Sequence, residues 1–242
     1  MGLVSREIPY LDGDTALTGQ LWLDESRSDR RPGLLLVHGA GGLDAHIADQ
    51  AARYVDLGFV VFAPDMFGPG AAGDRAKALG AIGALRADPD ALVARARAGL
   101  DQLVALPETD GRHAALGFCF GGLTVITMAR AGLPLAGVVS MHGALATARP
   151  AAPDSMTVPV LACHGADDPH VPMPDVVAFV AEMQAAGADW QLNAYGGAVH
   201  GFTHRVVPAV APGIAYHEPT DRRSFAAARL FLDEVLNRVA VG

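Results

Sequence analysis

The feature that most constrains this fold is the alternation of short apolar runs with longer segments of helical periodicity. The runs are apolar at nearly every position, which is typical of strands covered on both faces of a sheet. Between them apolar residues recur with the helical period. Strands alternating with helices form parallel βαβ units, so we predict a three-layer α/β fold with a mostly parallel sheet. The predicted strands are Gly33–Val37, Phe59–Ala63, His113–Phe118, Ala136–Met141, Val158–Cys163 and Trp190–Tyr195. The predicted helix stripes include Ile47, Ala51, Tyr54 and Val55, then Val176, Phe179, Val180 and Met183, and finally Phe231, Leu232, Val235, Leu236 and Val239.

The residues before the first of these strands predict a different pairing. Arg6–Tyr10 and Leu17–Leu23 have strand character, and the turn residues Asp12–Gly13–Asp14 lie between them. Two strands joined by so short a turn pair antiparallel, so we expect a hairpin at one edge of the sheet. No repeat, low-complexity tract or long linker divides the chain, and we predict a single domain over residues 1–242.

The composition excludes several classes of protein. The chain has 242 residues, of which 51% are hydrophobic and 18% charged, and its formal net charge is −8. These values exclude a disordered chain and make nucleic acid a poor candidate partner. Two cysteines cannot build a disulfide framework. Met1–Tyr10 lacks the apolar region of a secretory signal, and no apolar run approaches the about 20 residues of a membrane span. We therefore expect a cytoplasmic protein that binds neither nucleic acid nor membrane.

The most informative stretch is Gly117–Phe118–Cys119–Phe120–Gly121–Gly122, which follows a predicted strand and opens a predicted helix. It is the G-x-S-x-G pattern of a nucleophile elbow with cysteine in the place of serine. In such a turn the chain passes close by, two residues before and after the nucleophile, where only small residues fit. The N-terminus of the next helix stabilises a thiolate, the reactive form of cysteine. We therefore predict Cys119 as a nucleophile; the alternative is a small apolar residue in a glycine-rich turn.

Two later segments offer partners for this cysteine. On this architecture the catalytic residues follow one another as nucleophile, acid and base. Asp167 and Asp168 follow the predicted strand Val158–Cys163, and His200 follows the predicted strand Trp190–Tyr195. Because parallel strands end at one edge of the sheet, we expect these side chains near Cys119. His200 is the predicted base, and both aspartates are candidates for the acid.

The glycines after the first parallel strand indicate where the backbone approaches a substrate. The segment is Val37–His38–Gly39–Ala40–Gly41–Gly42. An N–H of such a loop, together with the N–H after the nucleophile, forms an oxyanion hole. We assign these groups to Ala40 and Phe120. A phosphate-binding loop is the competing interpretation, but the segment has neither G-x-G-x-x-G nor Gly-Lys-Ser/Thr.

Four motifs together resemble the dienelactone hydrolase family over almost the whole chain. The resemblance implies a single-domain α/β-hydrolase with a Cys–His–Asp triad that opens lactones or cleaves esters without a cofactor. The spacing of Gly165, Asp168 and Val171–Pro172 is similar to the acid loop of α/β-hydrolases, which selects Asp168 over Asp167. The motifs are Gly117–Phe118–Cys119–Phe120–Gly121–Gly122, Pro64–Asp65–Met66–Phe67, Asp168–Pro169–His170–Val171–Pro172 and His200–Gly201–Phe202.

The resemblance also concerns substrate binding. The founding enzymes of the family hold a substrate carboxylate with arginines, and Arg75 and Arg205 lie in the matching regions. Solvated surface arginines are the alternative. Met66, Phe67 and Phe202 flank the motif loops and are predicted to form an apolar pocket wall with His142, although bulky residues at such places are often plain core.

One position departs from the family pattern. The founding enzymes have a glutamate two residues after the first parallel strand that holds the resting thiol, and Gly39 stands at the matching position. We therefore predict a Cys119–His200 ion pair in the resting enzyme. The alternative is that His38 or Asp65 takes over the role of the glutamate.

The histidines that follow predicted strands raise the alternative of a metal site. His38, His142 and His164 end three predicted strands, and three histidines can hold zinc. No H-E-x-x-H motif or i,i+4 pair is present, so we predict no metal and no cofactor. Cys163, inside an apolar strand, is predicted to be a core residue.

The leading functional hypothesis is a cofactor-independent hydrolase of a lactone or carboxylic ester that works through an acyl-enzyme on Cys119. Its partner would be a small-molecule ester or lactone, and the protein would be a monomer or weak homodimer. The alternatives are a thioesterase, a glutamine-amidotransferase-like cysteine enzyme, and a non-catalytic binding module on the same fold.

Overall fold

One eight-stranded sheet runs through the computed structural model, which describes residues 2–71, 73–205 and 212–237. The strand order is β1-β2-β4-β3-β5-β6-β7-β8. The first two strands form the expected antiparallel hairpin at the edge, β2 also pairs antiparallel with β4, and the remaining pairs are parallel. The strands are β1 (Leu3–Asp12), β2 (Thr15–Asp24), β3 (Arg31–Val37), β4 (Val60–Ala63), β5 (Thr109–Phe118), β6 (Val138–Met141), β7 (Val160–Gly165) and β8 (Trp190–Tyr195).

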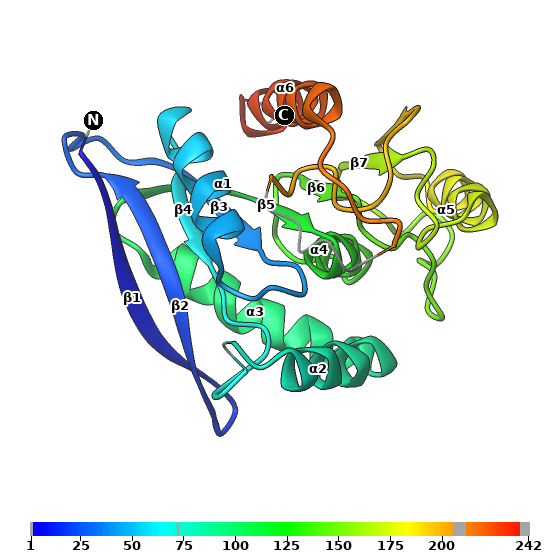
Figure 1. The fold of residues 1–242 in the computed structure, drawn as a ribbon. Coiled ribbons are helices and arrows are strands. Elements are labelled where there is room, and N and C mark those ends of the chain that lie inside the picture. The colour runs from blue at the N-terminus through cyan, green and yellow to red at the C-terminus, as the bar shows by residue number, and fades with distance from the viewer. Residues whose placement is uncertain (1, 72, 206–211, 238–242) are drawn as a thin grey trace.

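Helices cover both faces of the sheet, as predicted (Figure 1). On one face lie α1 (Ala45–Asp56) and α6 (Glu218–Asn237), and their apolar residues pack on the sheet in one cluster. The second cluster holds α3 (Pro89–Ala105), α4 (Phe120–Arg130) and α5 (Met173–Ala185) on the opposite face, and α2 (Arg75–Ala87) packs beside α3. The predicted stripe at Ile47, Ala51, Tyr54 and Val55 is buried, whereas Val180 is only half-buried and Val239 lies outside the described residues.

The last strand differs from its prediction. Residues 190–195 were expected to be covered on both faces, yet none of them is fully buried. The reason is that β8 is the last strand of the sheet and, in the described part of the chain, pairs only with β7. Gln191 and Ala194, which point to opposite faces of the sheet, are exposed, and the other four residues of β8 are half-buried.

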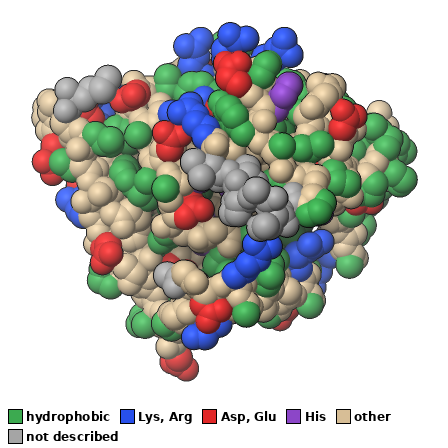
Figure 2. All heavy atoms as spheres, viewed as in Figure 1, with side chains coloured by type: hydrophobic (Ala, Val, Ile, Leu, Met, Phe, Trp, Pro, Cys, Tyr) green, Lys and Arg blue, Asp and Glu red, His purple; other side chains and the backbone are tan. Residues whose placement is uncertain are grey.

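The parallel part of the sheet determines where chemistry can occur. The chain leaves β3, β5, β7 and β8 at the same edge, because these strands run parallel in one sheet. The loops that follow them carry the residues singled out in the sequence. On the face seen in Figure 2, acidic and basic side chains are interspersed. None of the helices in the described part of the chain has the length and apolar character needed to cross a membrane.

Candidate active site

Cys119 lies in a strained turn between β5 and α4. Its backbone has φ 53° and ψ −111°, a region that residues other than glycine rarely adopt. The turn is fixed by the hydrogen bond from the Cys119 N–H to the Met141 carbonyl, at 2.9 Å. A Cβ atom on Gly117 would lie 2.1 Å from the Gly121 oxygen, and one on Gly121 would lie 2.1 Å from the Val37 oxygen. Both glycines are therefore required by the close approach of three backbone segments, as the elbow pattern predicted.

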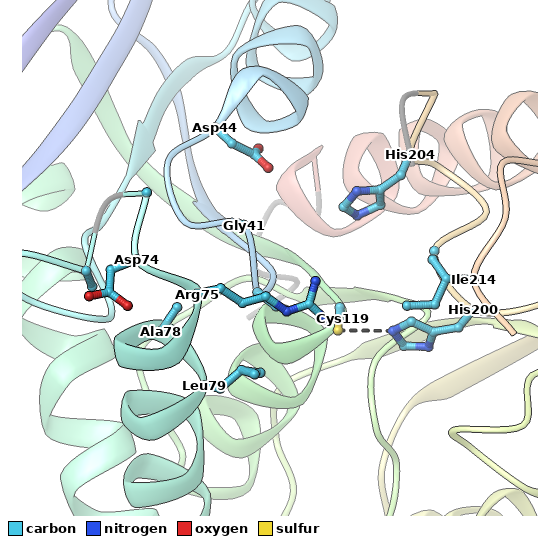
Figure 3. Close-up of a pocket in the computed structure, with 14 residues that line it drawn as sticks. Gly41, Asp44, Asp74, Arg75, Ala78, Leu79, Cys119, His200, His204 and Ile214 are labelled. Carbon is cyan, nitrogen blue, oxygen red and sulfur yellow. Dashed lines mark hydrogen bonds between the residues drawn. The ribbon is translucent and has the colours of Figure 1, made fainter. Parts of the chain in front are cut away.

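The structure brings Cys119, His200 and Asp168 into one hydrogen-bonded line. Figure 3 shows the bond between Cys119 and His200. The Nε2 atom of His200 lies 3.0 Å from the Cys119 sulfur, and its Nδ1 atom lies 2.8 Å from Asp168 Oδ2. The Asp168 side chain is completely buried, and its other oxygen accepts the His170 N–H at 2.8 Å. Asp167 points elsewhere and accepts the Gly197 N–H at 3.1 Å. The geometry therefore favours Asp168 over Asp167 as the partner of the imidazole.

The contacts along this line shift the pKa values of all three side chains. Burial raises the pKa of the Cys119 thiol, but the hydrogen bond and positive charge of His200 outweigh it, and the net pKa is below its ordinary value. Burial opposes the charging of His200 too, yet its contacts with Asp168 and Cys119 raise its pKa to about 10. The pKa of Asp168 is lowered, because the His200 contacts overcome burial. Both shifts are in the direction that stabilises a thiolate beside an imidazolium.

The two backbone N–H groups that were predicted to form the oxyanion hole belong to Ala40 and Phe120. The backbone N–H groups of Phe120 and Ala40 both lower the pKa of Cys119, so both lie near its sulfur. Phe120 is the first residue of α4, where N–H groups have no partner within the helix. Two N–H donors from separate loops thus meet at one point, as oxyanion stabilisation requires.

His38 and Asp65 are engaged in loop structure. The Nε2 atom of His38 accepts the Met66 N–H at 3.2 Å, which places the ring proton on Nδ1, 2.9 Å from the Gly39 oxygen. Asp65 accepts the N–H groups of residues 67 and 68 at 2.9 and 3.0 Å. Both side chains form hydrogen bonds with the backbone of these loops. Neither has a hydrogen bond to Cys119 among the described residues.

Cys119 and His200 open onto a cavity of about 360 Å³ (Figure 3). Its walls come from the oxyanion loop, from the beginning of α2 with the loop before it, and from the segment after His200. The lining residues are Ala40, Gly41, Asp44, Ala71, Gly73, Asp74, Arg75, Ala78, Leu79, Cys119, His200, Gly201, His204 and Ile214.

Of the six pocket residues predicted from sequence, Arg75 lines this cavity and the other five do not. Arg205 is directed away, with Asp49 at 3.7 Å and Asp221 at 3.8 Å. Phe67 packs against the rings of His38 and Phe120. The remaining three are fully buried in the protein interior and do not line the cavity. These three are Met66, His142 and Phe202.

Sequence reasoning missed seven lining side chains: Ala71, Asp74 and Ala78 on the side of α2, and further Asp44, Leu79, His204 and Ile214. Asp44 carried a signal, since an aspartate before a helical stripe is a typical N-cap, and it accepts the Ile47 N–H at 3.2 Å. Leu79 remains 50% exposed although it is large and apolar. No motif in the sequence marks His204 or Ile214, which follow His200 in the chain and also line the cavity.

His142 belongs to a buried polar cluster behind the base. Its Nε2 atom lies 2.9 Å from the Thr203 hydroxyl, and that hydroxyl lies 3.1 Å from His46 Nε2. The His142 ring stands edge-on to the ring of His200 at 5.2 Å, and His46 stacks on His204 at 3.7 Å. Burial holds the pKa of His142 well below its ordinary value, so its ring is neutral. Thr203 thus joins the loop that carries His200 to His142, just after β6, and to His46 on α1.

Metal binding finds no support in the described part of the chain. No group of three or more His, Cys, Asp or Glu side chains is placed there to hold a metal ion. His38 and His142 use ring nitrogens for the hydrogen bonds described above. Cys163 is 2% exposed in β7, and its sulfur lies 3.8 Å from the Tyr195 hydroxyl.

The strand order, the elbow after β5 and the loops after β7 and β8 define an α/β-hydrolase fold. A comparison with known protein families shows which family of this fold the chain resembles. The model of the dienelactone hydrolase family matches residues 20–236, and the chain belongs to this family of hydrolases.

Solved structures agree with this assignment. A protein described as m3DLH is 38% identical, with a TM-score of 0.92, and the match covers 98% of this chain and 100% of that one. A dienelactone hydrolase-like promiscuous phosphotriesterase from metagenomic libraries is 36% identical, with a TM-score of 0.91 and the same coverage of 98% and 100%. The dienelactone hydrolase of Anabaena variabilis shares the fold at 17% identity and a TM-score of 0.66, over 96% of this chain and 98% of that one. No curated protein sequence matches this chain significantly.

Proposed function

We propose that this protein hydrolyses a carboxylic ester or lactone through a Cys119–His200–Asp168 triad. The observation that carries the proposal is the convergence on one sulfur of an imidazole at 3.0 Å and of the Phe120 and Ala40 N–H groups. A nucleophile, a base held by a buried carboxylate, and an anion-stabilising site are the three parts that acyl transfer needs.

The first half of the reaction forms a thioester. The Cys119 thiolate attacks the substrate carbonyl carbon, and the carbonyl oxygen becomes an oxyanion that the N–H groups of Ala40 and Phe120 stabilise. The intermediate collapses, the bond to the leaving oxygen breaks, and the His200 imidazolium gives its proton to that oxygen. The products of this half are an alcohol and an acyl-enzyme; from a lactone, the hydroxyl remains attached to the acyl group.

The second half returns the enzyme to its resting state. His200, now neutral, takes a proton from water as the water oxygen attacks the thioester carbonyl. The second oxyanion collapses, the C–S bond breaks, and the acid is released. Cys119 leaves as a thiolate beside the newly protonated His200. Asp168 holds the imidazole in one tautomer and orientation throughout.

Hydrolysis of neutral model substrates tests the proposal. The panel consists of 4-nitrophenyl acetate, the lactone dihydrocoumarin, an acetyl thioester and the phosphotriester paraoxon, the last because a relative is described as a promiscuous phosphotriesterase. We expect turnover of the ester or lactone, and a loss of about 1,000-fold or more in kcat/KM for Cys119→Ala.

Cys163→Ala is the matched control, because it removes the other cysteine from a buried position that does not line the cavity. It should keep most of the wild-type rate. Equal losses in the two variants, or full activity of Cys119→Ala, would contradict the proposed nucleophile. Faster turnover of the thioester or phosphotriester than of both carboxylic substrates would reassign the substrate class.

A further inference from the structure

We propose that the acyl chain of the substrate lies along α2, against Leu79, and that this contact makes the enzyme prefer a longer apolar acyl chain to an acetyl group. The inference rests on the proposed function and adds to it which wall of the cavity binds which part of the substrate. Its starting point is that one of the three walls beside Cys119 carries Leu79, a large apolar side chain that is 50% exposed.

The reacting carbon has one substituent for each wall of the cavity. After the Cys119 sulfur has attacked, this carbon holds the sulfur, the oxyanion, the leaving oxygen and the acyl chain. The oxyanion binds to the N–H groups of Ala40 and Phe120, and the leaving oxygen must lie within reach of His200 Nε2, which gives it a proton. Around a tetrahedral carbon the fourth substituent points away from the other three, so the acyl chain is directed at the remaining wall.

The remaining wall is the beginning of α2. Figure 3 shows α2 with Leu79 on one side of Cys119 and His200 on the other side. Arg75, Ala78 and Leu79 line the cavity from this helix, and their spacing of three and four residues places them on one of its faces. An acyl chain directed away from His200 therefore meets this face of α2.

The wall on the side of His200 belongs to the leaving group. Ile214 lines the cavity there, and its backbone forms a β-bridge with that of His200. A group whose oxygen receives a proton from His200 therefore lies beside Ile214 rather than beside Leu79. The two apolar side chains thus contact different halves of the substrate.

Leu79 has apolar surface for an acyl chain to cover. Because half of this side chain is exposed, a chain that covers it removes apolar surface of both partners from water. Full burial of one methylene group favours binding by about fourfold. Arg75, one turn earlier, extends toward Cys119 and ends in a guanidinium (Figure 3). Uncharged chains that differ only in methylene groups form no ion pair with it, so their comparison does not measure its charge.

Two esters with the same leaving group measure the preference. 4-Nitrophenyl acetate and 4-nitrophenyl butanoate differ by two methylene groups of the acyl chain. Each kcat/KM is divided by the rate constant of hydroxide-catalysed hydrolysis, which removes the difference in intrinsic reactivity. We expect the wild type to prefer the butanoate by about fivefold to tenfold, because two methylene groups that are only partly covered fall short of the about 16-fold effect of full burial.

Variants at three positions identify the wall that the acyl chain contacts. Leu79→Ala should lower the preference for the butanoate by about threefold or more, whereas Leu79→Met, which keeps an apolar side chain of similar size, should retain it. Ile214→Ala is the matched control inside the cavity, since both esters have the same leaving group and its contact cancels in the ratio. Leu230→Ala is the control outside, because Leu230 is an exposed leucine on α6 that does not line the cavity. Neither control should change the preference.

The outcomes separate this inference from the proposed function. If both esters are hydrolysed through Cys119 without a preference for the butanoate, the acyl contact is refuted and the proposed function stands. A preference that Leu79→Ala leaves unchanged, or that Ile214→Ala lowers as much as Leu79→Ala does, also refutes the assignment of the walls. If the wild type hydrolyses neither ester faster than Cys119→Ala does, both proposals fail.

Discussion

Alkylation of Cys119 by iodoacetamide across a range of pH measures the resting charge state of the site. Iodoacetamide is uncharged and reacts with the thiolate, so the rate follows the thiolate fraction. At the 3.0 Å that separates His200 Nε2 from the Cys119 sulfur, unit charges attract by about 5 kcal/mol at an effective dielectric constant of about 20. Burial opposes this attraction, but the net effect lowers the pKa of the thiol.

The sign of the pH dependence follows from these shifts. The thiolate is present above the lowered pKa of Cys119 and is lost as the pH falls through it. His200 stays protonated until the pH approaches its raised pKa of about 10. We therefore expect the alkylation midpoint of the wild type to lie below the free-thiol value of about 8.5.

His200→Gln removes the attraction and leaves the burial. The pKa of the thiol should then rise above about 8.5, so that less than about 3% is thiolate at pH 7 and alkylation there slows about tenfold or more. Peptide-resolved mass spectrometry supplies an internal control, because burial raises the pKa of Cys163 to about 12 and this thiol should remain unlabelled. A wild-type midpoint at or above about 8.5, or no change in His200→Gln, would refute the ion pair.

Three further predictions concern the groups that support the site. Asp168→Asn should lower kcat by about 10⁴ in steady-state assays with the fold intact, whereas Asp167→Asn should change it less than about tenfold. Gly121→Ala should abolish or strongly lower the thermal unfolding transition, since its Cβ would meet backbone at 2.1 Å. Gly83→Ala, in open space on α2, should instead raise the free energy of unfolding by about 0.5–1 kcal/mol. Thr203→Val should reduce kcat more than it changes KM, and Thr203→Ser should restore kcat; equal effects of both Thr203 variants would contradict a role for the hydroxyl.

The sheet and the line from Cys119 to Asp168 were predictable because they depend on local patterns. Runs such as Gly33–Val37 are apolar at every position only when both faces are covered, and the order of the strands brings their ends to one edge. The glycines around Cys119 reflect contacts at 2.1 Å that no other residue permits. Such constraints leave a direct trace in the residue types.

The side chains that line the cavity could not be predicted from local patterns of residue types. Whether a loop side chain faces the cavity or the interior depends on packing against residues far away in the chain. Phe202 and His204 are two residues apart, yet the first is buried and the second lines the cavity. Likewise Arg205 lies next to His204 and is drawn to Asp49 and Asp221 instead. The residue type alone does not distinguish these cases.

The strand order also has a kinetic consequence. All neighbouring pairs from β4 through β8 are parallel, so each joins segments separated by a crossover and closes a long loop before its contacts form. Cys119, Asp168 and His200 follow β5, β7 and β8, so the site exists only once that half of the sheet is complete. During refolding, catalytic competence should therefore emerge late, after a period in which open strand edges are exposed to association with other chains.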